Sequence, residues 1–132
     1  MVTTVNKKLV IHNVPLDEIK LNEKGLIIEL DDINEERWEL VFRPFQDIKI
    51  TGYDCYGIEN MLDSEDSFAS GRYQRYLLEI KDSERIKELR TQLADPYDDF
   101  LVNSRHFYLD LRDHIVEIIA WNVEMRKLEK SK

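Results

Sequence analysis

Three histidines and one cysteine are the residues of this chain best suited to metal binding or nucleophilic chemistry. His12, His106 and His114 are far apart in the sequence, and no His-x-His or Cys-x-x-Cys pair is present. Zinc needs three or four nitrogen, sulfur or oxygen ligands, and only His106 and His114 could face each other across one hairpin. Cys55 has no flanking signature of an activated thiol and is expected to be a small core residue. The sequence therefore predicts no metal and no cofactor.

Glu117 is the carboxylate whose surroundings could most change its chemistry. It interrupts an otherwise apolar run from Ile115 to Val123. Desolvation disfavours a charge there unless the carboxylate finds a partner such as Arg105 or Arg112. A group of this kind can act as an acid or base, but it is more often solvent-facing or half of a structural ion pair. No glycine-rich phosphate loop or other catalytic motif accompanies it, so we expect a protein that is not an enzyme, with no catalytic residue.

Aromatic and acidic residues suggest a different kind of site, one that contacts another protein. Two tyrosines precede the polar stretch ENMLDSEDSFASG at residues 59–71, which is typical of a mobile surface loop. Tyrosines often anchor interfaces, and acidic surfaces attract basic partners. The alternative is that most of these rings pack in the core. The predicted partner-binding residues are Tyr53, Tyr56, Asp63, Glu65 and Asp66.

The charge is unevenly distributed and favours a basic protein as the partner. The formal net charge is −8, and residues 17–66 hold 15 acidic and 5 basic residues, so the remainder carries a net +2. An acidic surface repels phosphate backbones and anionic lipids, which argues against nucleic acid and membrane as partners. The alternative is that the acidic residues only keep the protein soluble.

Length and composition predict one globular domain in the cytoplasm. The chain has 132 residues, of which 42% are hydrophobic and 35% charged, and this is enough for one core. Its apolar runs are shorter than the roughly 20 residues of a membrane helix. The first residues lack the pattern of a signal peptide, and a single cysteine fits a reducing compartment.

The elements that would hold these residues are organised around a hairpin near the C-terminus. Residues 107–111 and 115–123 are rich in β-branched, aromatic and aliphatic side chains and flank the polar break Arg112-Asp113-His114. The first run alternates and predicts a half-buried strand. Apart from Glu117, the second is apolar on both faces and predicts a central strand with layers on each side.

Five further strands are predicted, one each at residues 8–14, 26–30 and 72–80 and two within residues 37–53, where period-two alternation is clearest. Pro44 should mark an edge, bulge or bend between two strands. Residues 16–24 are ambiguous and are taken as a loop, and the residues after Val123 are taken as a frayed terminus. One helix is predicted at residues 83–94, capped by Asp82 or Ser83 and stopped by Asp95-Pro96. It should cover one face of the sheet.

These elements predict an α+β protein, with a mainly antiparallel sheet of about seven strands, curled or sandwich-like, and one helix packed on it. The function they favour is a non-catalytic protein-interaction module, inhibitor-like or immunity-like. The alternative is a β-barrel-like protein that binds a small molecule, and a metal-independent enzyme is a third. No oligomeric state is predicted. The barrel cavity would be lined by Leu40, Phe42, Tyr76, Leu78, Phe107 and Leu109.

Overall fold

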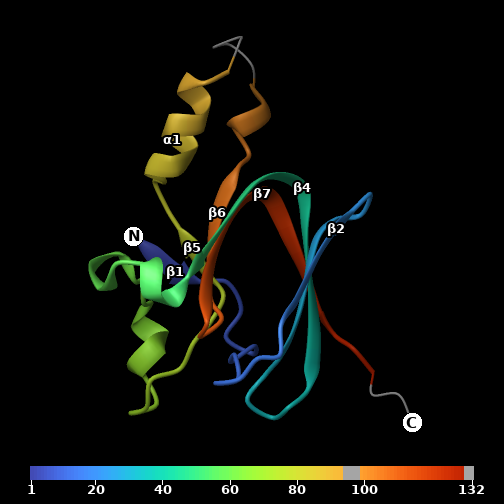
Figure 1. Ribbon diagram of the computed structural model, residues 1–132, viewed down its shortest axis with the longest axis vertical. Helices are drawn as coiled ribbons and strands as arrows, with labels where there is room; N and C mark the ends of the chain where they lie inside the picture. Colours follow the sequence, from blue (N-terminus) through green and yellow to red (C-terminus); the bar gives the residue numbers. More distant parts are fainter. Residues whose placement is uncertain (94–98, 130–132) are drawn as a thin grey trace.

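The computed structural model, which describes residues 1–93 and 99–129, is an antiparallel sheet of seven strands with one α-helix in the described part of the chain (Figure 1). This confirms the predicted α+β class. From edge to edge the strands are β1 (Val2–Thr4), β5 (Leu78–Ile80), β6 (Arg105–Asp110), β7 (His114–Lys127), β4 (Arg37–Gly52), β3 (Gly25–Asp31) and β2 (Glu18–Asn22). The helix is α1 (Glu84–Thr91), and the short 3-10 helices are η1 (Tyr53–Cys55), η2 (Ile58–Asn60), η3 (Glu65–Phe68) and η4 (Asp99–Leu101).

The long strands β4 and β7 pair along almost their whole length and bend together in the middle of the sheet. Their register shifts between Phe45 and Asp47, one residue after the cis peptide bond between Arg43 and Pro44. The prediction of a bulge or bend at Pro44 is confirmed, although β4 continues through it as one strand. The sheet curls but does not close, and Ile11 makes single bridges to Asp32 and Arg75 near its two edges.

The inner face of the sheet, which carries Trp38, Leu40 and Phe42, holds the main core. Phe42 and Phe107 meet edge to face there, with ring centroids 5.2 Å apart. The six residues expected around a ligand cavity do not line one. Leu40, Phe42, Phe107 and Leu109 are fully buried in this core, whereas Tyr76 and Leu78 belong to a second cluster on the opposite, outer face.

The outer face of β6 is covered by the segment between β4 and β5. Tyr108 and Ile115 pack with Tyr76 and Leu78, and with the partly buried Met61, Leu62 and Tyr56. Strand β6 is therefore buried on both faces, not half-buried, and the helix supplies little of this cover. The predicted loop at residues 59–71 contains η2 and η3, and its Ser64 caps η3 and hydrogen-bonds to Thr4 of β1.

Two predictions for the N-terminal third are wrong. Residues 8–14 do not form a strand, because Leu9 and Ile11 cross the open end of the curled sheet and bury their side chains there. Residues 16–24, taken as a loop, contain the edge strand β2. Strand β2 is largely exposed, so its sequence lacks the apolar alternation of a buried strand.

The C-terminal prediction is wrong for residues 124–127, which continue β7 along β4. Met125 packs against the main core, while Glu124 and Arg126 on the other face form ion pairs with Arg43 and Glu39. Residues 124–127 look polar in the sequence, because half of the side chains at this end of the strand face solvent.

The predicted helix is confirmed as α1, with Ser83 as its N-cap accepting a hydrogen bond from the Ile86 amide, but it ends at Thr91, before the predicted residues 92 and 93. It lies beside the end of β6 rather than over the middle of the sheet (Figure 1). The predicted stop at Asp95-Pro96 and the last predicted helical residue, 94, lie outside the described residues. In the described ranges, no helix has the length and apolar character needed to cross a membrane.

Candidate partner-binding trough

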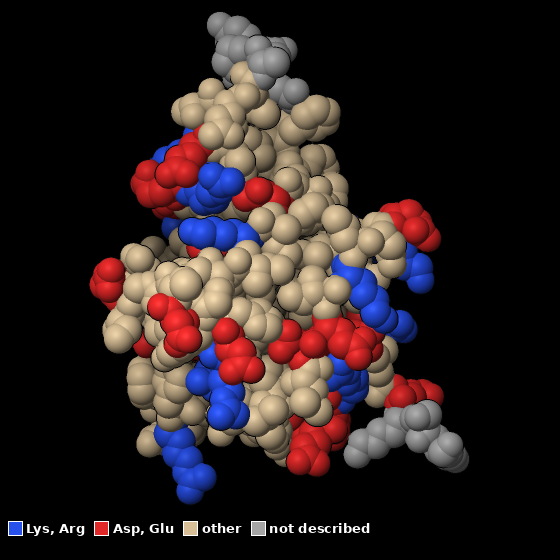
Figure 2. All heavy atoms as spheres, in the orientation of Figure 1, with Lys and Arg blue, Asp and Glu red and all other residues tan. Residues whose placement is uncertain are grey.

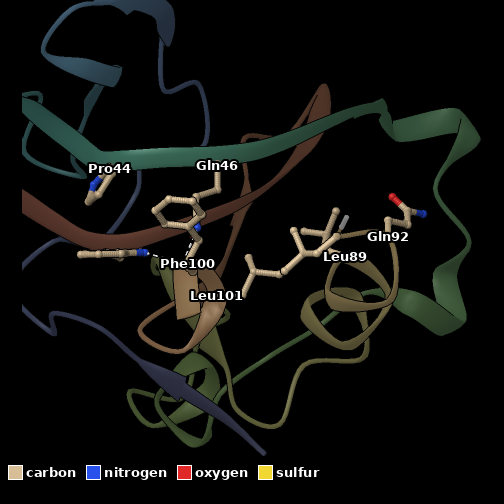
Figure 3. A pocket seen from close by; sticks show the side chains of 8 residues that line it. Pro44, Gln46, Leu89, Gln92, Phe100 and Leu101 are labelled. Carbon is tan, nitrogen blue, oxygen red and sulfur yellow. Dashed lines mark hydrogen bonds between the residues drawn. The ribbon is translucent and has the colours of Figure 1, made fainter. Parts of the chain in front are cut away.

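Two hollows of about equal volume lie between α1 and the outer face of β4 and β7, and we call them together the trough; Figure 3 shows the side chains that line the first, its apolar end. This end has a volume of about 600 Å³. Most of its lining side chains are apolar, and none of the lining residues in the described part of the chain is charged. They are Pro44 and Gln46 of β4, Trp121 of β7, Leu89 of α1, Gln92 and Leu93 just beyond α1, and Phe100 and Leu101 of η4.

Local sequence features position these side chains. Strand β4 bends near Pro44, where its register with β7 shifts, and the hollow is lined on the other side by Leu89 of α1 and by Leu93, two residues past the end of the helix. The carbonyl oxygen of Phe100 accepts hydrogen bonds from Trp121 Nε1 at 2.9 Å and from Gln46 Nε2 at 2.8 Å. These bonds tie η4 to both long strands and fix the width of the apolar end.

The polar end of the trough is a hollow of about 590 Å³ between α1, β4, β7 and the residues around η1. Glu117 and Lys49 form its floor, as direct neighbours on β7 and β4, and Tyr56 forms part of its wall. A smaller hollow of about 200 Å³, lined in part by Asp47 and Glu88, shares Glu117 and Lys49 with the polar end. Asp47 and Glu88 are the sequence neighbours of Gln46 and Leu89, which line the apolar end, but these two hollows share no lining residue in the described part of the chain, and the ion pair of Arg85 with Asp47 joins α1 to β4 between them.

A chain of hydrogen bonds crosses the polar end. His106 Nε2 lies 3.0 Å from Glu117 Oε1, and His106 Nδ1 lies 2.7 Å from Ser83 Oγ. A serine, a histidine and a carboxylate in a row resemble the parts of a hydrolase triad. However, Ser83 is only 7% exposed and its Oγ already accepts the Ile86 amide as the helix cap. No substrate could reach this hydroxyl. The three hydrogen-bonded residues instead hold α1 against β6 and β7.

Glu117 is one of the charged residues that line the polar end, with Lys49, Asp82, Glu84 and Arg85. The hydrogen bond from His106 lowers the pKa of Glu117, more than burial raises it, and the charge of Lys49 adds to this effect. Glu117 is therefore ionised at neutral pH. Burial, together with the charge of Glu117, raises the pKa of Tyr56, so its hydroxyl keeps its proton.

Several sequence expectations about this region are corrected. Glu117 pairs with His106, not with Arg105 or Arg112, and Arg105 bonds to Glu79 at 2.7 Å. His106 and His114 do not face each other: His106 lies opposite Ile119, and His114 bonds to Asp17 at 2.9 Å. Cys55 is exposed at the polar end instead of buried in the core.

Of the five predicted partner-binding residues, the structure places Tyr56 in the trough and the others outside its lining. Tyr53 and Glu65 are exposed. Asp63 hydrogen-bonds to Tyr73, and Asp66 accepts from Thr4 Oγ1 at 2.7 Å and pairs with Lys7 at 3.4 Å. Two of the three carboxylates therefore have partners within the chain. The sequence did not single out the apolar end, although the spacing of Leu89 and Leu93 was visible.

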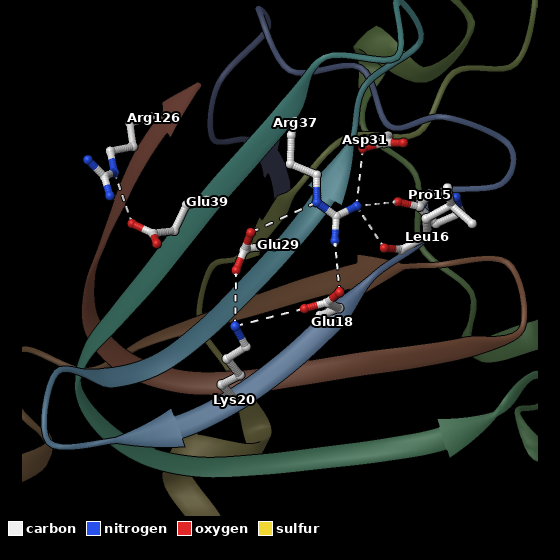
Figure 4. A network of polar contacts seen from close by, with 9 residues as sticks. All are labelled: Pro15, Leu16, Glu18, Lys20, Glu29, Asp31, Arg37, Glu39 and Arg126. Atoms are coloured by element: carbon white, nitrogen blue, oxygen red, sulfur yellow. Dashed lines mark hydrogen bonds and ion pairs between the residues drawn. The ribbon is translucent and has the colours of Figure 1, made fainter. Parts of the chain in front are cut away.

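The other concentration of carboxylates, on β2, β3 and β4, is also internally paired (Figure 4). Arg37 contacts Asp31 at 3.1 Å and both Glu18 and Glu29 at 3.9 Å, and it donates to the Leu16 carbonyl at 2.7 Å. Such a network joins the edge strand to the sheet. It is a weaker candidate for a partner site than the trough, because its carboxylates are already paired with Lys20, Arg37 and Arg126.

Among the residues that the structure describes, no group of three His, Cys, Asp or Glu side chains could hold a metal ion. In comparisons with known proteins, no family model, no curated protein and no solved structure matches this chain.

Proposed function

We propose that this protein is a non-catalytic protein-interaction module that binds a segment of a basic partner protein in the trough between α1 and the β4–β7 pair. The observation that carries the proposal is the apolar end, where about 600 Å³ is lined mostly by apolar side chains. Grooves of this kind take one or two bulky anchor side chains of a partner, which supply most of the binding free energy. More specifically, we propose that the module acts in the manner of an inhibitor or immunity protein.

The surface around the trough supports a protein as the occupant. Phe100 is 65% exposed and Val102 61% exposed, which extends the apolar area beyond the hollow itself. Figure 2 shows an almost uncharged surface over η4 and the bend of β4, while charged side chains gather on α1 and over the lower half of the molecule. An apolar centre with a charged rim is the usual composition of a protein interface.

The basic character of the partner follows from charge complementarity. The chain carries a net charge of −8, so a basic partner is attracted before contact is made. The trough adds the ionised Glu117 at its polar end. We therefore expect the bound segment to combine a bulky apolar residue with at least one basic residue.

A displayed library of random peptides, selected on the immobilised protein, tests this function without knowledge of the natural partner. We expect the selected peptides to share an apolar anchor and a basic residue. Leu89→Asp should weaken the best peptide at least about tenfold in calorimetry, because it puts a charge in the apolar end. Leu21→Asp, on the exposed edge strand β2, is the matched control and should bind normally. Equal binding by both variants, with circular dichroism unchanged, would overturn the proposal.

Binding of a small apolar molecule is the second candidate, favoured by the volume of the apolar end, which falls within the range of small-molecule sites. It would be preferred if a fragment screen by nuclear magnetic resonance found ligands at Trp121 and Leu89 while the peptide library gave no common sequence.

A further inference from the structure

We infer that the polar end of the trough binds the guanidinium group of an arginine side chain from the partner, held between the Glu117 carboxylate and Tyr56. The inference rests on the proposed function, since it names the chemistry of one residue in the bound segment. It depends on different side chains from those that form the apolar end, so it can fail separately.

Glu117 has hydrogen-bonding capacity left for such a ligand. Its Oε1 accepts a hydrogen bond from His106 at 3.0 Å, whereas its Oε2 accepts a long one, 3.5 Å, from the Tyr56 hydroxyl. An ionised carboxylate can accept about four hydrogen bonds. The side chain is 19% exposed, so a ligand can reach it while most of the surrounding water is excluded, which strengthens a charge-assisted bond.

The hollow fits the shape of a guanidinium better than that of a free anion. Its volume of about 590 Å³ admits an arginine side chain, and the Tyr56 ring in its wall offers the aromatic surface on which a planar cation packs. The nearby Arg85 does not attract an anion, because its guanidinium is bonded to Asp47 at 3.1 Å and to Glu88 at 3.4 Å.

The positive charge of Lys49 opposes the binding of a guanidinium, so a change at Lys49 tests the inference. It lies directly opposite Glu117 on β4 and lines the same hollow, but it forms no salt bridge with a described residue. Its side chain is exposed and flexible, so it can turn toward solvent when a cation binds. Removing its charge should therefore strengthen the binding of a guanidinium and weaken the binding of any anionic group.

The test uses N-acetyl-arginine amide as the probe and its neutral isostere N-acetyl-citrulline amide as the control ligand. In nitrogen-15 spectra of the full chain, we expect saturable shifts at Tyr56, His106 and Glu117 with the arginine compound only. The probe should also slow the reaction of Cys55 with a thiol reagent, because this cysteine lines the same hollow.

Variants of Glu117 and Lys49 then test whether these two side chains recognise the charge of the probe. Glu117→Gln, which keeps the hydrogen bond with His106, should weaken the probe about tenfold, whereas Glu124→Gln, an exposed carboxylate on the same strand, should not. Lys49→Met should tighten it about twofold to threefold. Equal shifts with the citrulline compound, or weaker binding by Lys49→Met, would overturn the inference. If the probe fails while peptides still bind at Leu89, the proposed function stands and only the guanidinium site is lost.

Discussion

Glu117 and His106 together explain how a charged residue remains in an otherwise apolar strand. Glu117 faces the trough at the point where the outer face changes from buried to accessible, and His106, almost fully buried beside it, donates from one ring nitrogen. The other ring nitrogen meets the Ser83 hydroxyl, so both polar atoms of the imidazole are satisfied. The pair fixes the position of α1 and leaves one carboxylate oxygen directed toward the trough.

We predict that Glu117→Gln lowers the free energy of unfolding by about 1 kcal/mol at pH 7, because the amide oxygen keeps a hydrogen bond with His106 but loses the charge that about doubles the strength of such a bond. The pKa of Glu117 is lowered in the folded state from an ordinary value of 4.5. The contribution of the charge is therefore complete above that value and is lost as the pH falls through the folded pKa. Urea unfolding from pH 7 to pH 3 should show the difference between wild type and variant shrinking below about pH 4.5. A constant difference across this range would contradict the charged pairing.

The role of Glu117 as half of a structural pair could be predicted from the sequence, but its partner could not. Arginine was expected because it is nearby in the hairpin, whereas strand pairing and the side-chain reach of His106 decide the contact. In the same way, Cys55 looked like a core residue, yet it lies on η1, where its thiol is exposed at the polar end.

At the scale of elements, the turn between β3 and β4 is fixed by one buried carboxylate. Asp32 is 2% exposed and accepts hydrogen bonds from Trp38 Nε1 at 2.9 Å and from the amides of Asn34 and Glu36 at 2.8 and 3.0 Å. Burial opposes its charge, but these donors prevail and lower the pKa of Asp32.

We predict that Asp32→Ala destabilises the fold by about 2–4 kcal/mol, because it leaves the buried Trp38 donor and two amides without their acceptor. Asp32→Asn, which keeps an oxygen acceptor, should cost clearly less. Thermal unfolding of both variants checks this. Equal melting temperatures for the alanine variant and the wild type would show that the turn does not depend on this carboxylate.

The extension of β7 leads to a second prediction at this scale. Met125 lies opposite Leu40 of β4 and packs against the main core. Met125→Glu should destabilise the protein by about 2 kcal/mol, since it places a charge against apolar side chains, while Glu124→Gln at the neighbouring exposed position should change the unfolding free energy by less than about 0.5 kcal/mol. Equal stabilities in urea would mean that residues 124–127 do not contribute to the core.

Element prediction from the sequence worked where one face of a strand is fully buried. The central hairpin, β3, β4 and the capped helix follow directly from apolar period and capping residues. The edge strands β1 and β2 are short or exposed and give no such signal. Local patterns do not predict how residues 53–76 are arranged, because this segment covers the outer face of the sheet through long-range packing with Tyr108 and Ile115.

For the whole molecule, the charge distribution makes a prediction about the rate of binding. With a net charge of −8, association of a basic trough-binding peptide should slow about tenfold when the salt concentration rises from about 0.05 M to about 0.5 M. The dissociation rate should change much less, because the apolar contacts are insensitive to salt. Stopped-flow fluorescence measures both, with the same peptide carrying neutral residues as a control. An association rate independent of salt would contradict electrostatic steering.

The proposal that the trough is the binding surface is tested most directly by mapping a selected peptide on the protein with nitrogen-15 spectra. The predicted result is a continuous set of shifted amides on β4 around Gln46, on α1 around Leu89 and on β7 from Glu117 to Trp121. Shifts confined to residues 59–71, or to the exposed edge of β2, would contradict it and place the interaction on another face of the molecule.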